Sequence, residues 1–418
     1  MVLNGNDDLT VFDGAIGTEV QKRAPGSEEN LTDLLNVTRP EVIKSIHRDY
    51  IAAGAQFLTT NTFSANRIRL SRSNQEEKAN EINEKGASLA RSAIEESSRK
   101  EEISVAGSIG PTGETLVPLG DWTFDQFHAT FHAQAKSLKK GGADWIIIET
   151  MESLREATAA LVASLEVGLP VISSLSYGSR KRTSYGVVPE SGAVTLDYLG
   201  ADVLGMNCGT GPDPYPEIIG TYHEFTAKPL LAEANAGDPR LEDGEAVYDL
   251  TPEEYLEAIK PGLSLLSGVG SCCGSSPEFT KILAGVAPSY DGRTEPGPGV
   301  RQDYVSNNST VISLSDGLDF AEIHLADGEL EDIKEKVVSD RVNMLHLPES
   351  TRPTDQLEKS FARQLLQLRS ENPLGIVTND PELLKVFLTA QPGISPVRAT
   401  GKEKSIRRVA EKYGGRLI

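Results

Sequence analysis

The stretch DWIIIETMESLREATAALVASLEVGLPVISSLSY, residues 144–177, indicates how the chain folds. Its two ends, DWIIIET (144–150) and PVISSLSY (170–177), are short apolar runs rich in β-branched residues, which is typical of buried strands. The segment between them, 152–168, has the apolar spacing of an amphipathic helix and closes at Gly168, a residue suited to a helix C-terminus. A strand, a helix and a second strand in this order form the repeating unit of a parallel sheet.

The same pattern recurs along the first 275 residues. The predicted strands are LTVFDG (9–14), QFLTTNTF (56–63), ISVAGSIG (103–110), DWIIIET (144–150), PVISSLSY (170–177), DVLGMNC (202–208), PLLAEANAG (229–237) and LSLLSGVG (263–270). Eight repeats of strand and helix predict an α/β fold, a (β/α)8 TIM barrel. An open doubly wound sheet is the alternative.

The sequence divides into three parts. Residues 1–288 carry the eight repeats, and a Pro/Gly-rich linker is predicted over 289–303. Residues 304–418 show a second α/β pattern that is too short for another full barrel, which takes about 200 residues or more. We therefore expect a smaller C-terminal α/β domain of unknown role.

Composition limits the classes of partner. The formal net charge of -20 repels phosphate backbones, so we expect no nucleic acid partner. No apolar run approaches the roughly 20 residues of a bilayer span, and the N-terminus lacks the pattern of a signal peptide. We therefore expect no membrane association and a cytoplasmic location, where three cysteines are more suited to thiol or metal chemistry than to disulfides.

All three cysteines follow predicted barrel strands. Cys208 ends the sixth strand, and Cys272 and Cys273 follow the eighth. The carboxyl ends of barrel strands meet on one face, where barrel enzymes hold their reacting groups. Three thiolates there suit a catalytic zinc ion, which takes three protein ligands and leaves one position open. A thiol substrate bound to such an ion is expected to lose its proton and become nucleophilic near neutral pH.

Other interpretations of these cysteines stay open. Adjacent cysteines can be a small buried pair, and a cysteine can act as a nucleophile without metal. Two glycine-rich segments, GVGSCCG and GTGP, lack the full pattern of a dinucleotide loop, and no GxSxG motif supports a serine hydrolase. Glu149 closes an apolar strand, where a buried charge is costly unless it is paired, so a functional role is favoured.

Six short motifs carry a family resemblance. They are Asp13-Gly14-Ala15-Ile16-Gly17-Thr18, Asn61-Thr62-Phe63, Gly110-Pro111-Thr112-Gly113-Glu114, Ile148-Glu149-Thr150, Asn207-Cys208 and Gly270 to Gly274. With them the chain resembles the homocysteine S-methyltransferase family over residues 7 to about 288. It is most similar to the homocysteine-binding barrel of cobalamin-dependent methionine synthase, especially in SIGPTGETLVPLGDWTF (108–124) and AEANAG (232–237). One loop departs, because Ser271 replaces the second glycine of the family's GGCCG.

The resemblance implies a role for each site residue. It implies zinc on the three cysteines, Cys208, Cys272 and Cys273. The amino group of homocysteine would meet Asp13 and Glu149, and its carboxylate the backbone amides near Gly14 and Ala15. Asn235 would occupy the fourth metal position when substrate is absent.

The implied activity is transfer of a methyl group to the thiol of homocysteine, which forms methionine. The expected donor is methylcobalamin or a methyl-corrinoid on a separate protein, since the chain shows no DxHxxG cobalamin motif. S-methylmethionine or a betaine is the alternative donor. A hypothesis of another class is a non-enzymatic thiol-binding or sensor protein built on the same barrel.

Overall fold

The computed structural model describes most of the chain. The described residues are 9–25, 31–238, 240–242, 245–290, 303–316, 319–325, 336–338, 341–347 and 372–418, with short pieces at 297, 351, 354, 356–357, 359–360 and 362–363. The linker predicted over 289–303 lies outside them except at positions 289, 290, 297 and 303. Within these described ranges, no helix is both long and apolar enough to cross a membrane.

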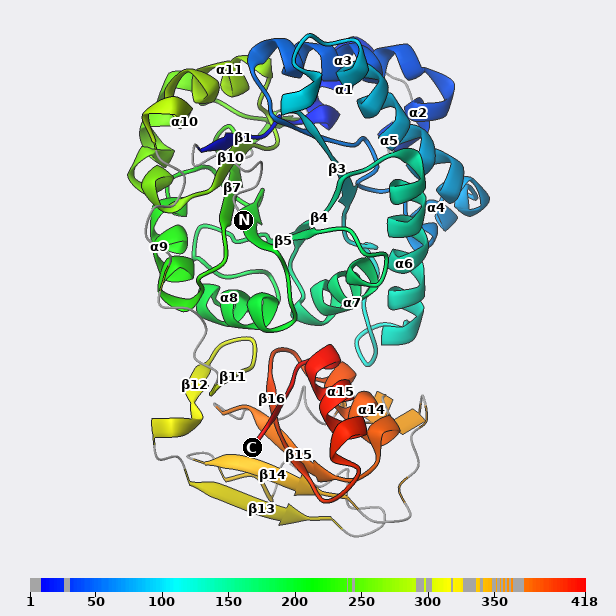
Figure 1. The fold of residues 1–418 in the computed structure, drawn as a ribbon, viewed down its shortest axis with the longest axis vertical. Coiled ribbons are helices and arrows are strands. Elements are labelled where there is room, and N and C mark those ends of the chain that lie inside the picture. The colour runs from blue at the N-terminus through cyan, green and yellow to red at the C-terminus, as the bar shows by residue number, and fades with distance from the viewer. Residues whose placement is uncertain are drawn as a thin grey trace.

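Eight parallel strands form the predicted barrel (Figure 1). They are β1 (Thr10–Val11), β2 (Phe57–Thr59), β3 (Ser104–Ile109), β4 (Trp145–Met151), β5 (Val171–Leu175), β6 (Val203–Asn207), β7 (Leu230–Ala234) and β10 (Gly268–Ser271). Their order in the sheet is β1-β10-β7-β6-β5-β4-β3-β2, and a parallel bridge between Phe12 and Phe57 joins the two ends. The barrel prediction is confirmed, and the open-sheet alternative is wrong.

Helices form the outer ring seen in Figure 1. They are α1 (Ile16–Arg23), α2 (Leu35–Thr38), α3 (Pro40–Ala53), α4 (Arg67–Ser71), α5 (Ala79–Glu95), α6 (Phe124–Gly141), α7 (Leu154–Leu165), α8 (Pro189–Tyr198), α9 (Tyr215–Phe225), α10 (Pro252–Ile259) and α11 (Pro277–Val286). Local signals set their ends: α6 begins at a capping box between Thr123 and Gln126, and α3 ends at Gly54 with a φ of 109°.

Apolar side chains fill the inside of the barrel. This interior cluster consists of Phe12, Phe57, Ala106, Ile147, Ile172, Val203 and Leu231. The rings of Phe12 and Phe57 are stacked with their centroids 4.5 Å apart. Side chains two residues apart on a strand share a face, so Glu149 and Glu233 lie above Ile147 and Leu231. The packed interior therefore restricts polar groups to the carboxyl end of the barrel.

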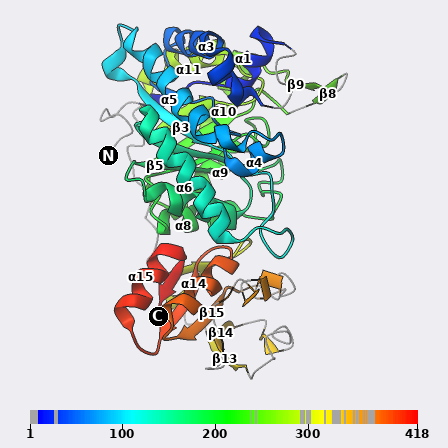
Figure 2. The ribbon, with the colours of Figure 1, turned by 90° about the vertical axis from the view of Figure 1, so that its right-hand side faces the viewer.

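The eighth strand begins later than predicted. The sequence pattern gave 263–270, whereas β10 spans Gly268–Ser271 and Lys260–Leu265 forms a 3-10 helix. Pro261 starts this helix, and Leu263 and Leu266, three residues apart, both turn into the core. An apolar run of this length does not distinguish a strand from a buried helical turn. A hairpin of β8 (Arg240–Glu242) and β9 (Glu245–Val247), which was not predicted, projects from the barrel (Figure 2).

The C-terminal part holds a five-stranded parallel sheet below the barrel (Figure 1). The five strands of the sheet are β13 (Phe320–His324), β14 (Val342–His346), β15 (Leu374–Thr378), β16 (Ser395–Ala399) and β17 (Gly415–Leu417). The C-terminal part also contains a hairpin of β11 (Tyr304–Ser306) and β12 (Val311–Ser313) and the helices α14 (Pro381–Ala390) and α15 (Glu403–Tyr413). In this part the sequence pattern comprised the strand-like runs TVISLS, VNMLHL and PLGIVT, the helical run PELLKVFLTA and a basic helical tail, which correspond to β12, β14, β15, α14 and α15. The strands β11, β13, β16 and β17 were missed. The helices α14 and α15 cover one face of the sheet.

Both the helices and the hairpin of this part contact the barrel. The ring of Tyr413 lies 6.0 Å from that of Phe124, edge to face, and Lys385 pairs with Asp125 at 2.8 Å. On the hairpin side, Val305 packs in one cluster with Val194 of α8. The two parts of the chain are therefore joined by apolar as well as polar contacts, while the domain limits 1–288 and 304–418 stay a prediction.

One buried histidine makes a prediction for acid stability. His47 of α3 is fully buried, and neither of its ring nitrogens has a hydrogen-bond partner among the described residues. Burial lowers the pKa of His47 to about 4. In the unfolded chain, the His47 imidazole binds a proton near pH 6.5. The stability that the folded state has with a neutral His47 is therefore complete above pH 6.5 and is lost as the pH falls towards 4. Between pH 7 and pH 5, His47 is therefore expected to lower the unfolding free energy of the wild type by about 2 kcal/mol. We expect the His47→Leu variant to lose about 2 kcal/mol less than the wild type over this range.

Urea unfolding at both pH values measures this difference. His132 of α6, whose side chain is 40% exposed, provides the matched histidine-to-leucine change outside the core. An equal acid loss in His47→Leu and in the wild type would contradict the assignment.

Candidate functional site

A pocket of about 400 Å³ opens at the carboxyl ends of the barrel strands. Of the residues predicted from the sequence, the structure brings seven together on its wall: Asp13, Gly14, Ala15, Glu149, Cys208, Cys272 and Cys273. Asn235 is not on the described wall of this pocket. We call this pocket the acidic pocket, after the carboxyl groups described below.

The three cysteine sulfurs form one cluster. All of them lie within 4.8 Å of one another, and Cys208 Sγ lies 3.8 Å from Cys273 Sγ. Tetrahedral zinc with Zn–S bonds of about 2.3 Å separates its sulfur ligands by roughly 3.8 Å. The spacing and the donor type therefore fit a zinc ion.

Unusual backbone conformations support this cluster. Cys208 has a φ of 57°, and Thr150, which follows Glu149, has a φ of 59°. Asn207 Oδ1 accepts a hydrogen bond from the Thr150 amide at 2.7 Å and so holds this conformation. Left-handed backbone at non-glycine residues costs energy and gathers at functional sites.

Gly274 closes the cysteine loop. Its φ is 80°, and a Cβ at this position would lie 2.2 Å from the ring of Tyr248. Hydrogen bonding with the Cys208 and Cys272 thiols lowers the pKa of Cys273, and Tyr248 contributes in the same direction. Interactions with the neighbouring thiols, together with burial, raise the pKa of Cys272. The three thiols therefore lie close enough to shift one another's pKa.

Asn235 lies directly after β7, between the two strands that carry the cysteines. It is 2% exposed, and its amide N–H donates to the Thr210 carbonyl at 3.2 Å. Its side-chain oxygen Oδ1 is buried without a hydrogen-bond partner in the described part of the chain. An unpaired buried amide oxygen can accept a hydrogen bond or coordinate a metal ion.

Three buried carboxyl groups face the same pocket. Burial raises the pKa of Asp13 to about 8 and that of Glu149 to about 7, and it raises the pKa of Glu233 well above its usual value. The described wall contains no lysine, arginine or histidine. A cationic group that entered the pocket would therefore find carboxyl groups without a competing cation.

Hydrogen bonds fix two of these carboxyl groups. Glu149 accepts from the Ser108 hydroxyl and, at 3.2 Å, from Asn207 Nδ2. Asp13 accepts from the Thr59 amide at 2.9 Å. Both side chains are thus oriented before any ligand binds.

Unpaired hydroxyl groups surround Gly14. A Cβ on Gly14 would lie 2.9 Å from Ser271 Oγ and 3.0 Å from the Tyr50 hydroxyl. Both hydroxyls are buried and lack a hydrogen-bond partner among the described residues. The Ala15 amide, expected from the resemblance to be free for a carboxylate, donates instead to Ser275 Oγ at 3.1 Å. The space beside Gly14 is therefore lined by hydroxyl groups, while the Ala15 amide is already engaged.

Sequence reasoning missed several residues of the site. Glu233 received no role, although it faces the pocket between Asn207 of β6 and Gly270 of β10 in the strand register. Its signal was a single charge in the buried strand LLAEA, two residues after the interior Leu231. The roles of Tyr248 and Ser275 had no signal, because they come from contacts between loops.

Comparison with known proteins identifies the family. The family model for homocysteine S-methyltransferase matches residues 10–286. Methionine synthase from Mycobacterium leprae is 31% identical over 332 residues, which cover 75% of this chain and 27% of that protein. Methionine synthase from Mycobacterium tuberculosis is also 31% identical, over 331 residues with the same coverage. The chain thus spans about a quarter of the length of these relatives.

Solved structures share the barrel fold. The homocysteine methyltransferase MmuM from Escherichia coli, in an oxidized form, superimposes with a TM-score of 0.57 and 23% identity over 68% of this chain and 97% of that one. Its metallated form gives the same TM-score and identity over 66% and 96% of the two chains. With the family model covering well over half of the residues, this chain belongs to the homocysteine S-methyltransferase family.

Proposed function

We propose that this protein is a zinc-dependent enzyme that transfers a methyl group to the thiol of homocysteine and so forms methionine. The observation that carries the proposal is the placement of three cysteine sulfurs in one pocket with three buried carboxyl groups. Homocysteine has one group for each feature, a thiol for the metal and an ammonium for the carboxyls.

Cys208, Cys272 and Cys273 would hold the zinc ion. Zinc in this position supplies positive charge that favours the thiolate form of a substrate thiol. The unpaired Oδ1 of Asn235 is our candidate for a fourth ligand in the absence of substrate. The spacing of the sulfurs supports the three cysteines as zinc ligands.

The remaining residues would bind the amino acid end of homocysteine. Asp13 and Glu149 would receive the ammonium group, and Glu233 would add a third carboxyl group beside them. The substrate carboxylate would lie against Gly14 and accept hydrogen bonds from the Ser271 hydroxyl and the nearby backbone. These contacts would fix the direction of the substrate thiol, and positioning of this kind is a main source of catalysis in group transfer.

We propose a methyl-corrinoid on a separate protein as the donor. The acidic pocket is small, about 400 Å³, and its polar groups are assigned above to metal and amino acid. The similarity to proteins named methionine synthase supports methionine as the product. S-methylmethionine and betaine are the competing donors.

A donor panel tests the proposal. Zinc-loaded protein is incubated with homocysteine and, in separate reactions, methylcobalamin, a methylated corrinoid protein, S-methylmethionine and betaine, and methionine is measured. We expect slow transfer from methylcobalamin and faster transfer from the protein-bound form. Turnover with S-methylmethionine or betaine alone would overturn the corrinoid donor, and homocysteine binding without turnover by any donor would favour a sensor.

A pair of glycine substitutions tests the substrate carboxylate position. Gly14→Ala would place a methyl group within 3.0 Å of three hydroxyl oxygens, in the space assigned to the carboxylate. We expect it to weaken homocysteine binding at least about tenfold, by steric conflict and by lost hydrogen bonds, with the zinc content unchanged. Isothermal titration with homocysteine measures the affinity.

Gly220→Ala is the matched control. No described atom lies within 4 Å of a Cβ built on Gly220, which lies in α9 and is not on the described wall of the acidic pocket. This variant is expected to bind homocysteine like the wild type. Equal affinities of the two variants would show that the space beside Gly14 is not used by the substrate.

A further inference from the structure

The carboxyl end of β4 departs from regular strand pairing at Glu149. The pairing of β4 with β5 is regular up to Ile148 and resumes, after an irregularity, at Met151. Two residues of β4, Glu149 and Thr150, thus face a single residue of β5 and form a bulge. Bulges gather next to active sites, where they aim a side chain away from the regular strand pattern. Here the bulge contains Glu149, which lies on the wall of the acidic pocket.

Asn207, the last residue of β6, bonds to both residues of this bulge. In the sheet order, β5 lies between β4 and β6, so the link is made by the side chain. Asn207 Oδ1 accepts from the Thr150 amide at 2.7 Å, and Nδ2 donates to the Thr150 hydroxyl at 2.9 Å. The same Nδ2 donates to Glu149 Oε2 at 3.2 Å. Asn207 is 1% exposed, so these bonds are shielded from water and costly to lose.

The amide of Asn207 also contacts the cysteine cluster. Cys272 Sγ lies 4.0 Å from Asn207 Nδ2. The chain continues directly from Asn207 into Cys208, whose φ is 57°. Side chains that contact a metal ligand in this way orient it without binding the metal themselves. Asn207 therefore connects the carboxyl group of Glu149 with the group of sulfurs.

The other oxygen of Glu149 is held from the opposite side. Ser108 of β3 donates its hydroxyl to Glu149 Oε1. With Ser108 on one oxygen and Asn207 on the other, the carboxyl group cannot turn without breaking a buried hydrogen bond. Its direction relative to the cysteines is therefore set before a ligand binds.

We propose that Asn207 is a positioning residue that fixes the distance between Glu149 and the cysteine cluster, and so selects amino acid thiols of the length of homocysteine. The inference rests on the proposed function, in which the thiol binds the zinc ion and the ammonium meets Asp13 and Glu149. Cysteine is one methylene shorter and does not place both end groups at once. A difference of one methylene changes specificity by about 10- to 200-fold where the contacts are fixed.

Binding of three thiols to the zinc-loaded, full-length protein tests this role. Homocysteine has both end groups, and cysteine has them one methylene closer together. The third thiol, 4-mercaptobutanoate, has the length of homocysteine but no ammonium group. Isothermal titration gives each affinity without methyl transfer. For the wild type, we expect homocysteine to bind at least about tenfold more tightly than either of the other two.

Asn207→Leu removes the hydrogen bonds and keeps the branched shape of the side chain. We expect homocysteine to bind about tenfold more weakly, because Glu149 is no longer held in place. The affinity for 4-mercaptobutanoate is expected to stay the same, since this thiol has no group for Glu149, and the zinc content is also expected to stay the same. Asn207→Ser, which is too short to reach either partner, is expected to have the same effects and provides the test if Asn207→Leu does not fold.

Thr150→Gly separates this role from simple support of the backbone. Thr150 has a φ of 59°, which glycine adopts without strain. If Asn207 served only to hold this backbone, Asn207→Leu in the Thr150→Gly protein would bind homocysteine like Thr150→Gly alone. We expect the loss of about tenfold to appear in the double variant as well.

Asn343→Leu is the matched control. Asn343 of β14 is also fully buried, and its side chain bonds to both the amide and the carbonyl of Val338 at 2.9 Å, but it lies in the C-terminal part. Asn343→Leu is expected to lower the stability in urea and to keep all three affinities of the wild type. An unchanged preference for homocysteine in a folded Asn207 variant, or full rescue by Thr150→Gly, would overturn the inference alone. Absence of zinc-dependent homocysteine binding in the wild type would overturn the proposed function and the inference with it.

Discussion

Cys273→Ser is expected to remove most of the zinc and to lower methyl transfer to homocysteine by about 10³-fold or more. The reason is that the described part of the chain offers one cluster of metal-ligating side chains, and it consists of the three cysteines. A serine hydroxyl does not lose its proton near neutral pH and is a poor zinc ligand. The fold is expected to survive, because Cys273 follows β10 in a loop outside the barrel interior.

Metal analysis and initial rates measure these effects, with circular dichroism and urea unfolding to monitor the fold. Ser276→Ala is the matched control, since it changes a small polar residue of the same loop whose side chain makes no cap hydrogen bond to α11. It is expected to keep about one zinc ion per chain and full activity. Full zinc and full activity in Cys273→Ser would exclude the cysteine cluster as the metal site.

The barrel and its cysteine cluster could be predicted because both depend on local patterns. Parallel strands buried on two faces are continuous apolar runs, and Ile146 to Ile148 of β4 are such a run. Once eight such runs are recognised, the geometry of a closed barrel brings their carboxyl ends together. Cys208 and Cys273, 65 positions apart in the sequence, thereby come to 3.8 Å.

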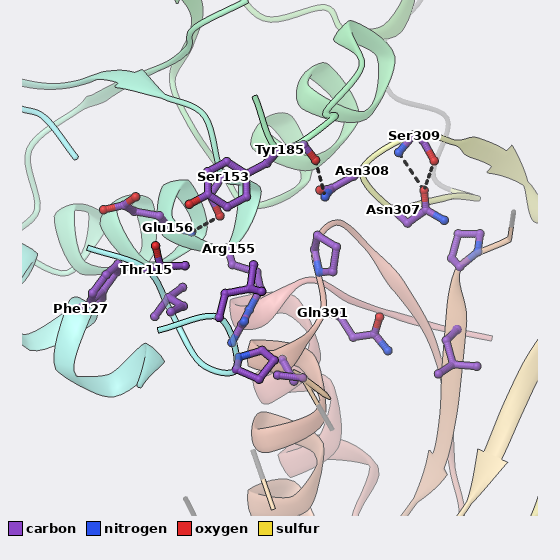
Figure 3. Close-up of a pocket in the computed structure, with 18 of the residues that line it drawn as sticks. Thr115, Phe127, Ser153, Arg155, Glu156, Tyr185, Asn307, Asn308, Ser309 and Gln391 are labelled. Atoms are coloured by element: carbon purple, nitrogen blue, oxygen red, sulfur yellow. Dashed lines mark hydrogen bonds between the residues drawn. The ribbon is translucent and has the colours of Figure 1, made fainter. Parts of the chain in front are cut away.

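Features that depend on contacts between distant loops could not be predicted. Ser275 binds the Ala15 amide across 260 positions, and nothing in either segment indicates this pairing. A cavity between the barrel and the C-terminal part of the chain likewise combines Tyr185 and Asn308 with Gln391, from three separate segments (Figure 3). The late start of β10 has another cause, because an apolar run such as 263–266 satisfies both a strand and a helical turn.

Glu149→Gln is expected to raise the KM for homocysteine about 30-fold and to leave the zinc content unchanged. Glu149 is one of three carboxyl groups in a pocket whose described wall has no basic residue, so no protein cation competes with the ammonium for this carboxyl group. Loss of one charge-assisted pair to an ammonium costs on the order of 2 kcal/mol, which corresponds to this change. Initial rates at varied homocysteine and a direct titration measure the effect.

Glu156→Gln separates a binding role from a structural one. Glu156 is buried, and burial raises its pKa to about 7, as it does for Glu149, but its carboxyl group binds Thr112 and lies outside the described wall of the acidic pocket. If Glu149 binds substrate, only Glu149→Gln changes the affinity for homocysteine, even where both variants lose some stability. If Glu149 only supports the end of β4 through Ser108 and Asn207, both variants are less stable and both bind homocysteine like the wild type. The second outcome would assign the ammonium to Asp13 and Glu233, since those two carboxyl groups would remain on the wall of the acidic pocket.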